Sequence, residues 1–443
     1  MFRKKKQPKL KRELGIFQAT FAGLGIILGA GIYALLGEAA AIAGNSLWIS
    51  FLIAAFVAAF TGLSYAELSS MYPKDSGEAE YGEKAFGKRV GFLLAWLIIF
   101  EGIVSAAAVA LGFGGYFGGL IASYVSLPIV MGAILCIVLF SFVNFWGIKE
   151  SSEFNIISTL IEGGGLILII VLGLSYFGKV DYMEMANGFG GTVSAAALIF
   201  FAFIGFEAIV KLSEETKNAE KIIPRALIYS IVISTILYVL VALASVSILG
   251  WQVLGASKAP LADVAAAVMG SNAFILLAVI ALFSTANTVL MILVTTARMM
   301  YGIGQKFKKI SWMSVIHNKR RTPYLAVAFT MILSIAFALI GDIKLVAEVT
   351  NFAIFATFII INGALLSIRY KYPKQRRPFK IPLNIGWFNI PAFFGILITT
   401  GLLFYLSQDW RIYAGGGVLI GLGLLTFSYL EHCNNHCKTK KKK

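Results

Sequence analysis

Charged residues, cysteine and histidine are all scarce in this chain of 443 residues. Asp, Glu, Lys and Arg make up 14% of the sequence, against about a quarter in an average soluble domain. The only cysteines are Cys136, Cys433 and Cys437, which excludes a small secreted scaffold held by disulfides. With 58% apolar residues, 13% aromatic residues and a mean hydropathy of +0.83, the composition also excludes a soluble globular protein and a disordered chain.

Apolar residues form continuous runs of about 20 residues, the length that an α-helix needs to cross a bilayer. The alternating segments of about ten residues that are typical of membrane β-strands are missing. Helices are the remaining way to pair backbone N–H and C=O groups in lipid. We therefore predict an all-α membrane protein with twelve transmembrane helices. The predicted spans are 15–37, 47–71, 90–121, 128–147, 154–178, 191–211, 224–250, 273–303, 323–341, 345–370, 388–407 and 411–430.

The net charge of +16 follows a membrane-topology pattern. With the amino terminus inside, all but four of the 38 Lys and Arg residues fall in predicted cytoplasmic segments; the exceptions are Lys179, Lys258, Lys344 and Arg411. Because this bias sets orientation, we expect a multi-pass protein of the cell membrane with both termini in the cytoplasm. Topology accounts for the charge, so no nucleic acid partner is expected. The final lysines, 440–443, should meet the anionic lipids of the inner leaflet.

Two predicted spans are interrupted at corresponding places. The first contains Gly29 and Gly31, and the sixth contains Gly205 followed by the ionisable Glu207. A glycine inside a helix costs about 1 kcal/mol relative to alanine, and a carboxylate facing lipid costs more, so both helices are predicted to be discontinuous. The interruptions lie five spans apart, which suggests two repeats of five spans each. Because five is an odd number, the second repeat starts on the opposite side of the membrane and has the inverted topology. This is the inverted-repeat design of secondary transporters; the alternative is that the glycines only allow close helix packing.

The repeat predicts how the chain is divided, and it leaves the last two helices outside. The oligomeric state cannot be read from the sequence. The predicted parts are a basic cytoplasmic segment (1–14), a first five-helix repeat (15–178), a second, inverted five-helix repeat (191–370), two further helices (388–430) and a basic cytoplasmic tail (431–443).

Eight short segments form a recognisable set of motifs: 25–33, 64–68, 72–74, 81–87, 201–207, 214–218, 223–226 and 298–301. Together they resemble the amino acid–polyamine–organocation (APC) superfamily, with its LeuT-type five-plus-five repeat, and most nearly the bacterial and archaeal permeases that are like cationic amino acid transporters. The chain departs from the family pattern at 304–306, where Arg-Asp-Gly is common, and at Asn218-Ala219, where Asn-Pro is usual. The resemblance implies a secondary active amino acid transporter that works by alternating access.

Backbone chemistry and the resemblance together predict a substrate site at the two breaks. Each broken turn frees N–H groups on one side and C=O groups on the other, which suits a zwitterion. The N–H groups of Ala30 and Gly31, at the positive end of a half-helix, are predicted to hold the substrate carboxylate. The carbonyl groups predicted to hold the amino group are those of Ile27, Phe201 and Ile204.

Aromatic residues surround the second break at Gly205, which is itself included in the predicted substrate-binding set. Phe203 and Phe206 are predicted to form an aromatic gate, and Phe201 to add an apolar wall. The alternative for at least one of these rings is ordinary packing inside the bundle.

Glu101 lies well inside the third span, where a charged side chain should face protein or water because insertion costs about 2.5–3.5 kcal/mol. Its spacing from Trp96 resembles that of cationic amino acid transporters of the bacterial type. We therefore predict that Glu101 contacts the substrate and favours a cationic side chain. The alternative is a structural hydrogen bond to a neighbouring helix.

Glu162 stands where many proton-coupled members of the superfamily have a lysine. A carboxylate removed from water binds a proton more readily, so Glu162 is predicted to carry a coupling proton. The alternatives are a cation such as sodium bound by ionised Glu162 with Ser284 and Thr285, and no coupling role. Glu207 is a second candidate for protonation; its alternative role is to brace the unwound segment by accepting backbone N–H bonds.

No enzyme, cofactor or metal site is predicted. Residues 82–89 nearly match a phosphate-binding loop but lack its final Ser or Thr and follow no strand. The His and Cys residues of 432–437 are expected to form a solvated tail, with adventitious zinc binding as the alternative. The functional alternatives to a proton-coupled permease are an amino acid or polyamine exchanger or facilitator, a channel, and a membrane amino acid sensor that does not transport.

Overall fold

The computed structural model describes residues 14–73, 77–122, 124–146, 148–213, 216–320 and 322–439. The predicted cytoplasmic segment up to residue 13 and the lysines at 440–443 lie outside these ranges. The helices are α1 (Ile16–Ile27), α2 (Ala30–Ala43), η1 (Gly44–Ser46), α3 (Leu47–Met71), α4 (Gly77–Phe86), α5 (Lys88–Ile121), α6 (Ile129–Trp146), α7 (Ile148–Gly173), η2 (Leu174–Tyr176), α8 (Gly188–Ile199), η3 (Phe200–Phe203), η4 (Phe206–Leu212), α9 (Ala219–Ala256), α10 (Pro260–Met269), α11 (Ser271–Lys306), η5 (Lys308–Ser314), α12 (Tyr324–Ala338), α13 (Ile343–Lys371), α14 (Ile390–Tyr405) and α15 (Trp410–Thr439).

Nine helical stretches within the described ranges are long and apolar enough to cross a membrane. One of them, Ala30–Met71, combines α2, η1 and α3, because Gly44 bends the chain at a φ of +77° without ending the run of helical residues. Four shorter apolar helices accompany these nine. Every predicted span overlaps one or more of these helices. The sequence does not predict α4 and α10, since each has only ten residues. These lengths and compositions are those of a multi-pass membrane protein.

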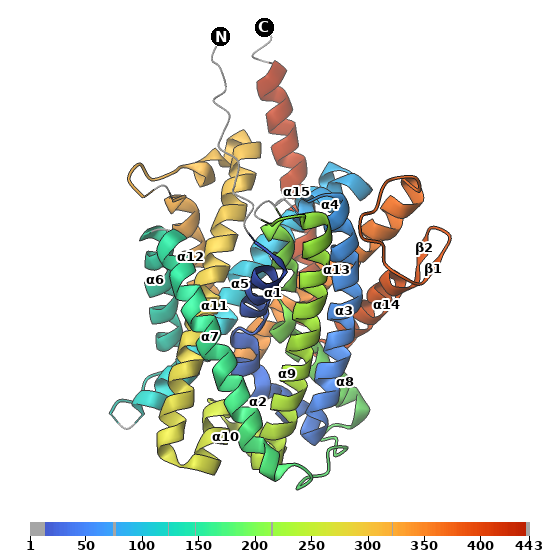
Figure 1. Cartoon of the computed structure of the whole chain (residues 1–443). Coiled ribbons are helices and arrows are strands. Elements are labelled where there is room, and N and C mark those ends of the chain that lie inside the picture. Colours follow the sequence, from blue (N-terminus) through green and yellow to red (C-terminus); the bar gives the residue numbers. More distant parts are fainter. Residues whose placement is uncertain are drawn as a thin grey trace.

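The long helices run side by side and form one bundle (Figure 1). In α5, 83% of the most apolar stretch is buried, against 28% in α15, so α5 lies in the interior and α15 at the periphery. α5 packs against α6, α11 and α13. The start of α1 and the end of α15 lie at the same end of the bundle (Figure 1).

Both spans predicted to be discontinuous are broken in the structure. α1 ends at Ile27 and α2 begins at Ala30, with Gly29 in an extended conformation between them. α8 gives way to the 3-10 helices η3 and η4, which lie on either side of Ile204 and Gly205. Gly205 has a φ of +115°, which glycine adopts without the steric penalty of a side chain. The prediction of two discontinuous helices is confirmed.

Besides an isolated parallel bridge between Leu14 and Thr216, the described ranges contain a short β-hairpin between α13 and α14. β1 (Asn384–Ile385) pairs antiparallel with β2 (Phe388–Asn389). The side chain of Asn389 accepts the N–H of Ala392 at 2.9 Å and so caps the start of α14. Figure 1 shows the hairpin at the periphery of the bundle, beside α13 and α14.

Candidate functional site

The first break lies against two neighbouring elements. A Cβ atom on Gly29 would lie 2.4 Å from the hydroxyl oxygen of Thr288 in α11. A Cβ atom on Gly31 would lie 2.4 Å from the Cα of Ala202 in η3. Both distances are far below van der Waals contact, so only glycine fits at these positions without displacing a neighbour. Gly31 therefore allows the first break to lie against the second, and Gly29 allows the first break to lie against α11.

The second break is held by Glu207. Ile204 has an extended backbone and Gly205 a left-handed one, so the N–H of Gly205 does not take part in the hydrogen bonds of either neighbouring helix. Both carboxylate oxygens of Glu207 accept this N–H, at 3.1 and 3.0 Å. A charged acceptor makes a stronger hydrogen bond than a neutral one. The contact is the bracing arrangement left open by the sequence, and protonation of Glu207 stays a prediction.

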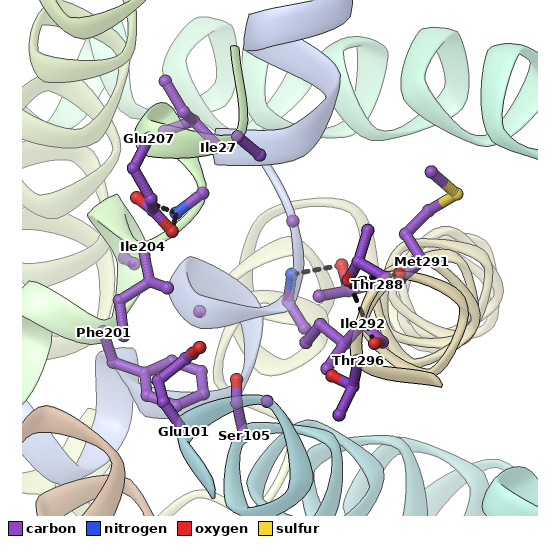
Figure 2. A pocket seen from close by; sticks show the side chains of 18 of the residues that line it. Ile27, Glu101, Ser105, Phe201, Ile204, Glu207, Thr288, Met291, Ile292 and Thr296 are labelled. Atoms are coloured by element: carbon purple, nitrogen blue, oxygen red, sulfur yellow. Dashed lines mark hydrogen bonds between the residues drawn. The ribbon is translucent and has the colours of Figure 1, made fainter. Parts of the chain in front are cut away.

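A cavity of about 110 Å³ lies between the two breaks, α5 and α11 (Figure 2). Eight residues predicted from the sequence line it: Ile27, Ala30, Gly31, Glu101, Phe201, Ile204, Gly205 and Glu207. Other lining residues come from α5 and α11: Ile98, Gly102, Ser105, Asn287, Thr288, Met291, Ile292, Thr295, Thr296 and Met299. Five predicted residues lie outside the described lining: Glu162, Phe203, Phe206, Ser284 and Thr285.

Several backbone groups predicted to bind substrate have partners within the protein. The N–H of Ala30 donates to the Thr288 hydroxyl at 3.1 Å. The hydroxyl of Tyr238 in α9 lies 2.6 Å from the carbonyl oxygen of Ile27 and 3.0 Å from that of Ala202, so it bridges the two breaks. A carbonyl oxygen keeps a second lone pair, whereas an N–H has one proton. Of these groups, the Ala30 N–H would have to exchange its partner to bind a carboxylate.

Glu101 lies on the face of α5 that lines the cavity. Ile98 and Ser105 share this face, because residues three and four apart lie on one side of a helix. Figure 2 shows the Glu101 side chain directed into the cavity, next to Phe201. Together with Glu207, the described lining contains two carboxylates and no Lys or Arg. Such a lining attracts cations and disfavours anions.

Glu162 lies on α7, behind the cavity lining, and is fully buried. Ser284 and Asn287 of α11 lie beside its carboxyl group. Neither carboxyl oxygen reaches hydrogen-bond geometry with a partner in the described parts of the chain. Thr285 instead donates to a carbonyl of its own helix at 2.7 Å. Asn287 also lines the cavity, so Glu162 and the cavity share a neighbour.

Phe203 and Phe206 belong to a buried aromatic cluster. The Phe203 ring centre lies 5.3 Å from that of Tyr238, and the Phe206 ring centre lies 5.3 Å from that of Phe358. Both phenylalanines are fully buried, whereas Phe201 is slightly exposed and lines the cavity. The contacts of Phe203 and Phe206 are those of packing residues, and a gating role for them stays a prediction.

Comparison with known proteins identifies the family. The family model described as amino acid permease matches residues 14–422, which include both breaks and the cavity lining. The chain belongs to the amino acid permease family. The resemblance to the APC superfamily that the motifs indicate is thereby confirmed.

Relatives of this permease cover most of its length. The branched-chain amino acid permease BcaP of Bacillus subtilis (strain 168) is 29% identical over 450 residues, which are 98% of this chain and 95% of the relative. The methylthioribose transporter of the same strain is 27% identical over 395 residues, 85% of each chain. Cationic amino acid transporter 1 of Arabidopsis thaliana is 28% identical over 382 residues, 82% of this chain and 63% of the relative. By their names, two of these relatives transport amino acids and one transports methylthioribose.

The sequence-based prediction omits the cavity face that α11 contributes to the permease. Its residues recur at intervals of three and four: Thr288, Met291, Ile292, Thr295, Thr296 and Met299. The available signal is the series of threonines inside an apolar span, since polar side chains there face protein or water. Tyr238 in α9 is also missing from the prediction, although a phenol hydroxyl inside an apolar span needs a partner when it is buried.

Proposed function

We propose that this permease is a secondary active amino acid transporter that works by alternating access. The observation that carries the proposal is the cavity enclosed by two chain breaks, where backbone polar groups and buried carboxylates meet. Irregular backbone at membrane depth is tolerated where it lines a cavity, and secondary transporters bind their substrates at such breaks. A channel would need a continuous polar pore instead.

The proposed architecture is a LeuT-type five-plus-five inverted repeat with twelve transmembrane helices. Its halves are residues 15–178 and 191–370, followed by two helices within 388–430. The support is that the breaks fall at the first helical unit of each half, between α1 and α2 and between η3 and η4. The charge bias supports the cell membrane as the location, with 1–14 and 431–443 in the cytoplasm.

The substrate backbone is proposed to bind between the breaks. Its carboxylate binds the N–H groups of Ala30 and Gly31 at the start of α2, where the helix dipole favours an anion. In doing so it replaces the Thr288 hydroxyl as the acceptor of the Ala30 N–H. The amino group binds free lone pairs on the carbonyl oxygens of Ile27, Phe201 and Ile204.

The substrate side chain is proposed to lie against Glu101, with a preference for cationic amino acids. The two carboxylates of the described lining, without a basic side chain, support this preference, as does the similarity to cationic amino acid transporter 1. A branched-chain amino acid is the second candidate. It is favoured by the apolar lining residues Ile98, Ile292 and Met299 and by the similarity to BcaP.

Transport is proposed to be driven by protons, with Glu162 as the carrier. Burial of an ionised carboxylate costs several kcal/mol unless hydrogen bonds compensate it, whereas the protonated group is neutral. Ser284 and Asn287 lie beside Glu162, but neither carboxyl oxygen is in hydrogen-bond geometry with them. A sodium ion would need an ionised Glu162 and several oxygen ligands, such as the hydroxyl oxygens of Ser284 and Thr285, and stays the alternative to a proton. Asn287, which lies beside Glu162 and lines the cavity, connects the proton site with the substrate site.

The structure is proposed to represent the state in which the cavity is closed toward the outside. The outer half of the first span is fixed to α5, because Tyr116 donates to the carbonyl oxygen of Tyr33 at 2.9 Å. The cavity lining instead extends to Ile98 and Met299, toward the end of the bundle where α1 begins. That end is the cytoplasmic one in the proposed orientation.

Uptake of labelled amino acids into proteoliposomes under an imposed pH gradient tests the proposal. We expect saturable uptake that is faster when the outside is acidic and is stimulated by unlabelled substrate inside. Binding without flux would indicate a sensor, and flux that does not saturate would indicate a channel. Uptake that requires internal substrate and ignores the gradient would indicate an exchanger of amino acids or polyamines.

The same assay tests the role of Glu162. Glu162→Gln removes the proton-binding group with little change in volume, so uptake should no longer follow the pH gradient. Glu348→Gln is the control, since Glu348 is also a buried carboxyl group but lies on α13 and is not among the described residues that line the cavity. If Glu162→Gln still follows the gradient, the proton role is wrong.

A further inference from the structure

The segment between α13 and α14, residues 372–389, has an inner face that is fixed to the bundle. Glu67, fully buried in α3, accepts the Nε of Arg369 at 2.8 Å and the backbone N–H of Ile381 at 2.9 Å. The Nε of Arg377 lies 3.2 Å from the same carboxylate. These contacts hold the α13–α14 segment as a defined surface and not as a loose loop.

The outer face of the α13–α14 segment is apolar. Leu383 is 66% exposed, Ile385 is 69% exposed and Trp387 is 47% exposed. The Trp387 ring packs against Tyr370 of α13, with ring centres 5.2 Å apart, and Tyr370 is itself 66% exposed. The hairpin that presents these side chains lies on the outside of the bundle (Figure 1). A contiguous exposed apolar patch of this kind marks a binding surface or a membrane contact.

Leu383 is held in a strained conformation. Its φ is +59°, which bulky residues rarely adopt. The hairpin imposes this conformation, because the Leu383 carbonyl accepts the N–H of Ile390 at 3.1 Å and the Asn384 side chain donates to the carbonyl of Ile381 at 2.6 Å. The strain is not offset by packing within the protein, since most of the side chain is exposed. An external apolar environment would offset it.

Exposed basic residues belong to the same segment as the apolar patch. The α13–α14 segment contains no Asp or Glu, and Lys374, Arg376 and Lys380 are exposed. Arg376 makes one ion pair at 3.7 Å with Glu220, and both side chains are largely open to solvent. Aromatic and apolar side chains beside Lys and Arg are typical of the headgroup region of a bilayer. Each cation near an anionic membrane surface adds attraction.

We propose that the α13–α14 segment is a docking surface for anionic phospholipid headgroups. The exposed apolar side chains of the hairpin enter the boundary between headgroups and acyl chains, and the exposed basic side chains contact the phosphates. In the proposed orientation, the lipids belong to the inner leaflet. Because Glu67 joins the segment to α3 and α13, the bound lipid also supports the ends of both helices.

Quenching by spin-labelled lipids tests whether the hairpin lies in the headgroup region. The full chain is labelled with bimane at Ile385→Cys, or at Lys84→Cys on the exposed face of α4 as a control, in phosphatidylcholine vesicles. Cys433 and Cys437 are replaced by serine, whereas Cys136 is buried. We expect a lipid with a nitroxide near its headgroup to quench the label at 385 and to leave the label at 84 nearly unchanged. Equal quenching at the two positions would overturn the proposal.

The same label tests the preference for anionic lipid. We expect labelled phosphatidylglycerol to quench at concentrations about tenfold lower than labelled phosphatidylcholine, a factor that one or two cation contacts supply. Replacing the three exposed basic residues of the segment should abolish this difference: Lys374→Gln, Arg376→Gln and Lys380→Gln. A matched triple replacement in the connection between α11 and α12 should keep it: Lys308→Gln, Lys309→Gln and Lys319→Gln. An unchanged preference in the first triple variant would contradict the proposal.

Leu383→Gly separates lipid docking from a structural role. Glycine relieves the strained φ, so the Tm of the detergent-purified protein should rise, while quenching at 385 should weaken because the apolar contact is lost. A side chain that only stabilised the fold would lower the Tm when removed. A lower Tm, or a higher Tm with unchanged quenching, would count against membrane insertion of Leu383. None of these readouts involves transport, so docking can fail while the transport proposal stands.

Discussion

Glu101 is the cavity residue whose charge is expected to select the substrate side chain. Glu101→Gln keeps the size of the side chain and removes its charge. A hydrogen bond to a charged group contributes about 1.5–3 kcal/mol, so the affinity for lysine and arginine should fall at least about tenfold relative to leucine. Competition between these amino acids in the uptake assay measures the ratio. Ser105→Ala, one turn away on the same face of α5, should leave the ratio unchanged.

The alternative for Glu101 has a different signature. If its carboxylate makes a structural hydrogen bond to a neighbouring helix, Glu101→Gln should lower the Tm of the purified protein and leave the preference between lysine and leucine as it was. A changed preference without a change in Tm would assign Glu101 to the substrate.

Tyr238 is expected to hold the two breaks together. Tyr238→Phe removes the hydroxyl that lies within hydrogen-bond distance of the carbonyl oxygens of Ile27 and Ala202 but keeps the ring that packs against Phe203. The loss of one buried hydrogen bond should cost about 1 kcal/mol, seen as a lower Tm. Tyr229→Phe on the same helix is the control, because Tyr229 is 50% exposed. Equal Tm values for the two variants would mean that the bridge is not needed.

At the scale of helices, the glycines of the first break determine how closely two discontinuous elements approach. Gly31→Ala places a Cβ 2.4 Å from a backbone atom of Ala202, which cannot move without η3. Overpacking of this kind costs about 1–3 kcal/mol, so both the Tm and substrate binding should fall. Gly302→Ala in α11 is the matched control, since no heavy atom lies within 4 Å of its added Cβ. A neutral Gly31→Ala would show that the close approach is dispensable.

The helices that could be predicted are those whose signal is local. Long apolar runs predict the spans, and the glycines at 29, 31 and 205 predict the breaks, because hydropathy and helix propensity belong to the residues themselves. The amphipathic helix α4 and the short helix α10 were missed because ten residues give too little periodicity. Thr288 and Tyr238 were missed for another reason: which face of α11 or α9 meets the breaks depends on packing between helices distant in sequence.

At the scale of the whole molecule, an exposed carboxylate fastens one end of the bundle and a fully buried carboxylate fastens the other. At one end, Glu184 of the connection between η2 and α8 accepts hydrogen bonds from Asn45 at 2.7 Å and from Trp251 at 2.8 Å. At the other end, Glu67 binds Arg369 and the segment that follows α13. The proposed alternating-access cycle opens one end while the other stays closed, so we expect both clusters to contribute to the balance between the two states.

Glu67→Gln is expected to be among the most damaging changes in the molecule. It leaves the guanidinium groups of Arg369 and Arg377 beside a neutral partner in a buried site, which should cost about 3–5 kcal/mol. Glu220→Gln removes the partner of exposed Arg376 and should cost only about 0–1 kcal/mol, which makes it the matched control in a thermal unfolding experiment. Adding Arg377→Gln to Glu67→Gln should recover part of the lost Tm, because one uncompensated charge is removed. If Glu67→Gln unfolds at the same temperature as the control, the carboxylate does not hold the α13–α14 segment, and its attachment must come from other contacts, such as the hydrogen bond from Tyr72 to Gln375 at 3.0 Å.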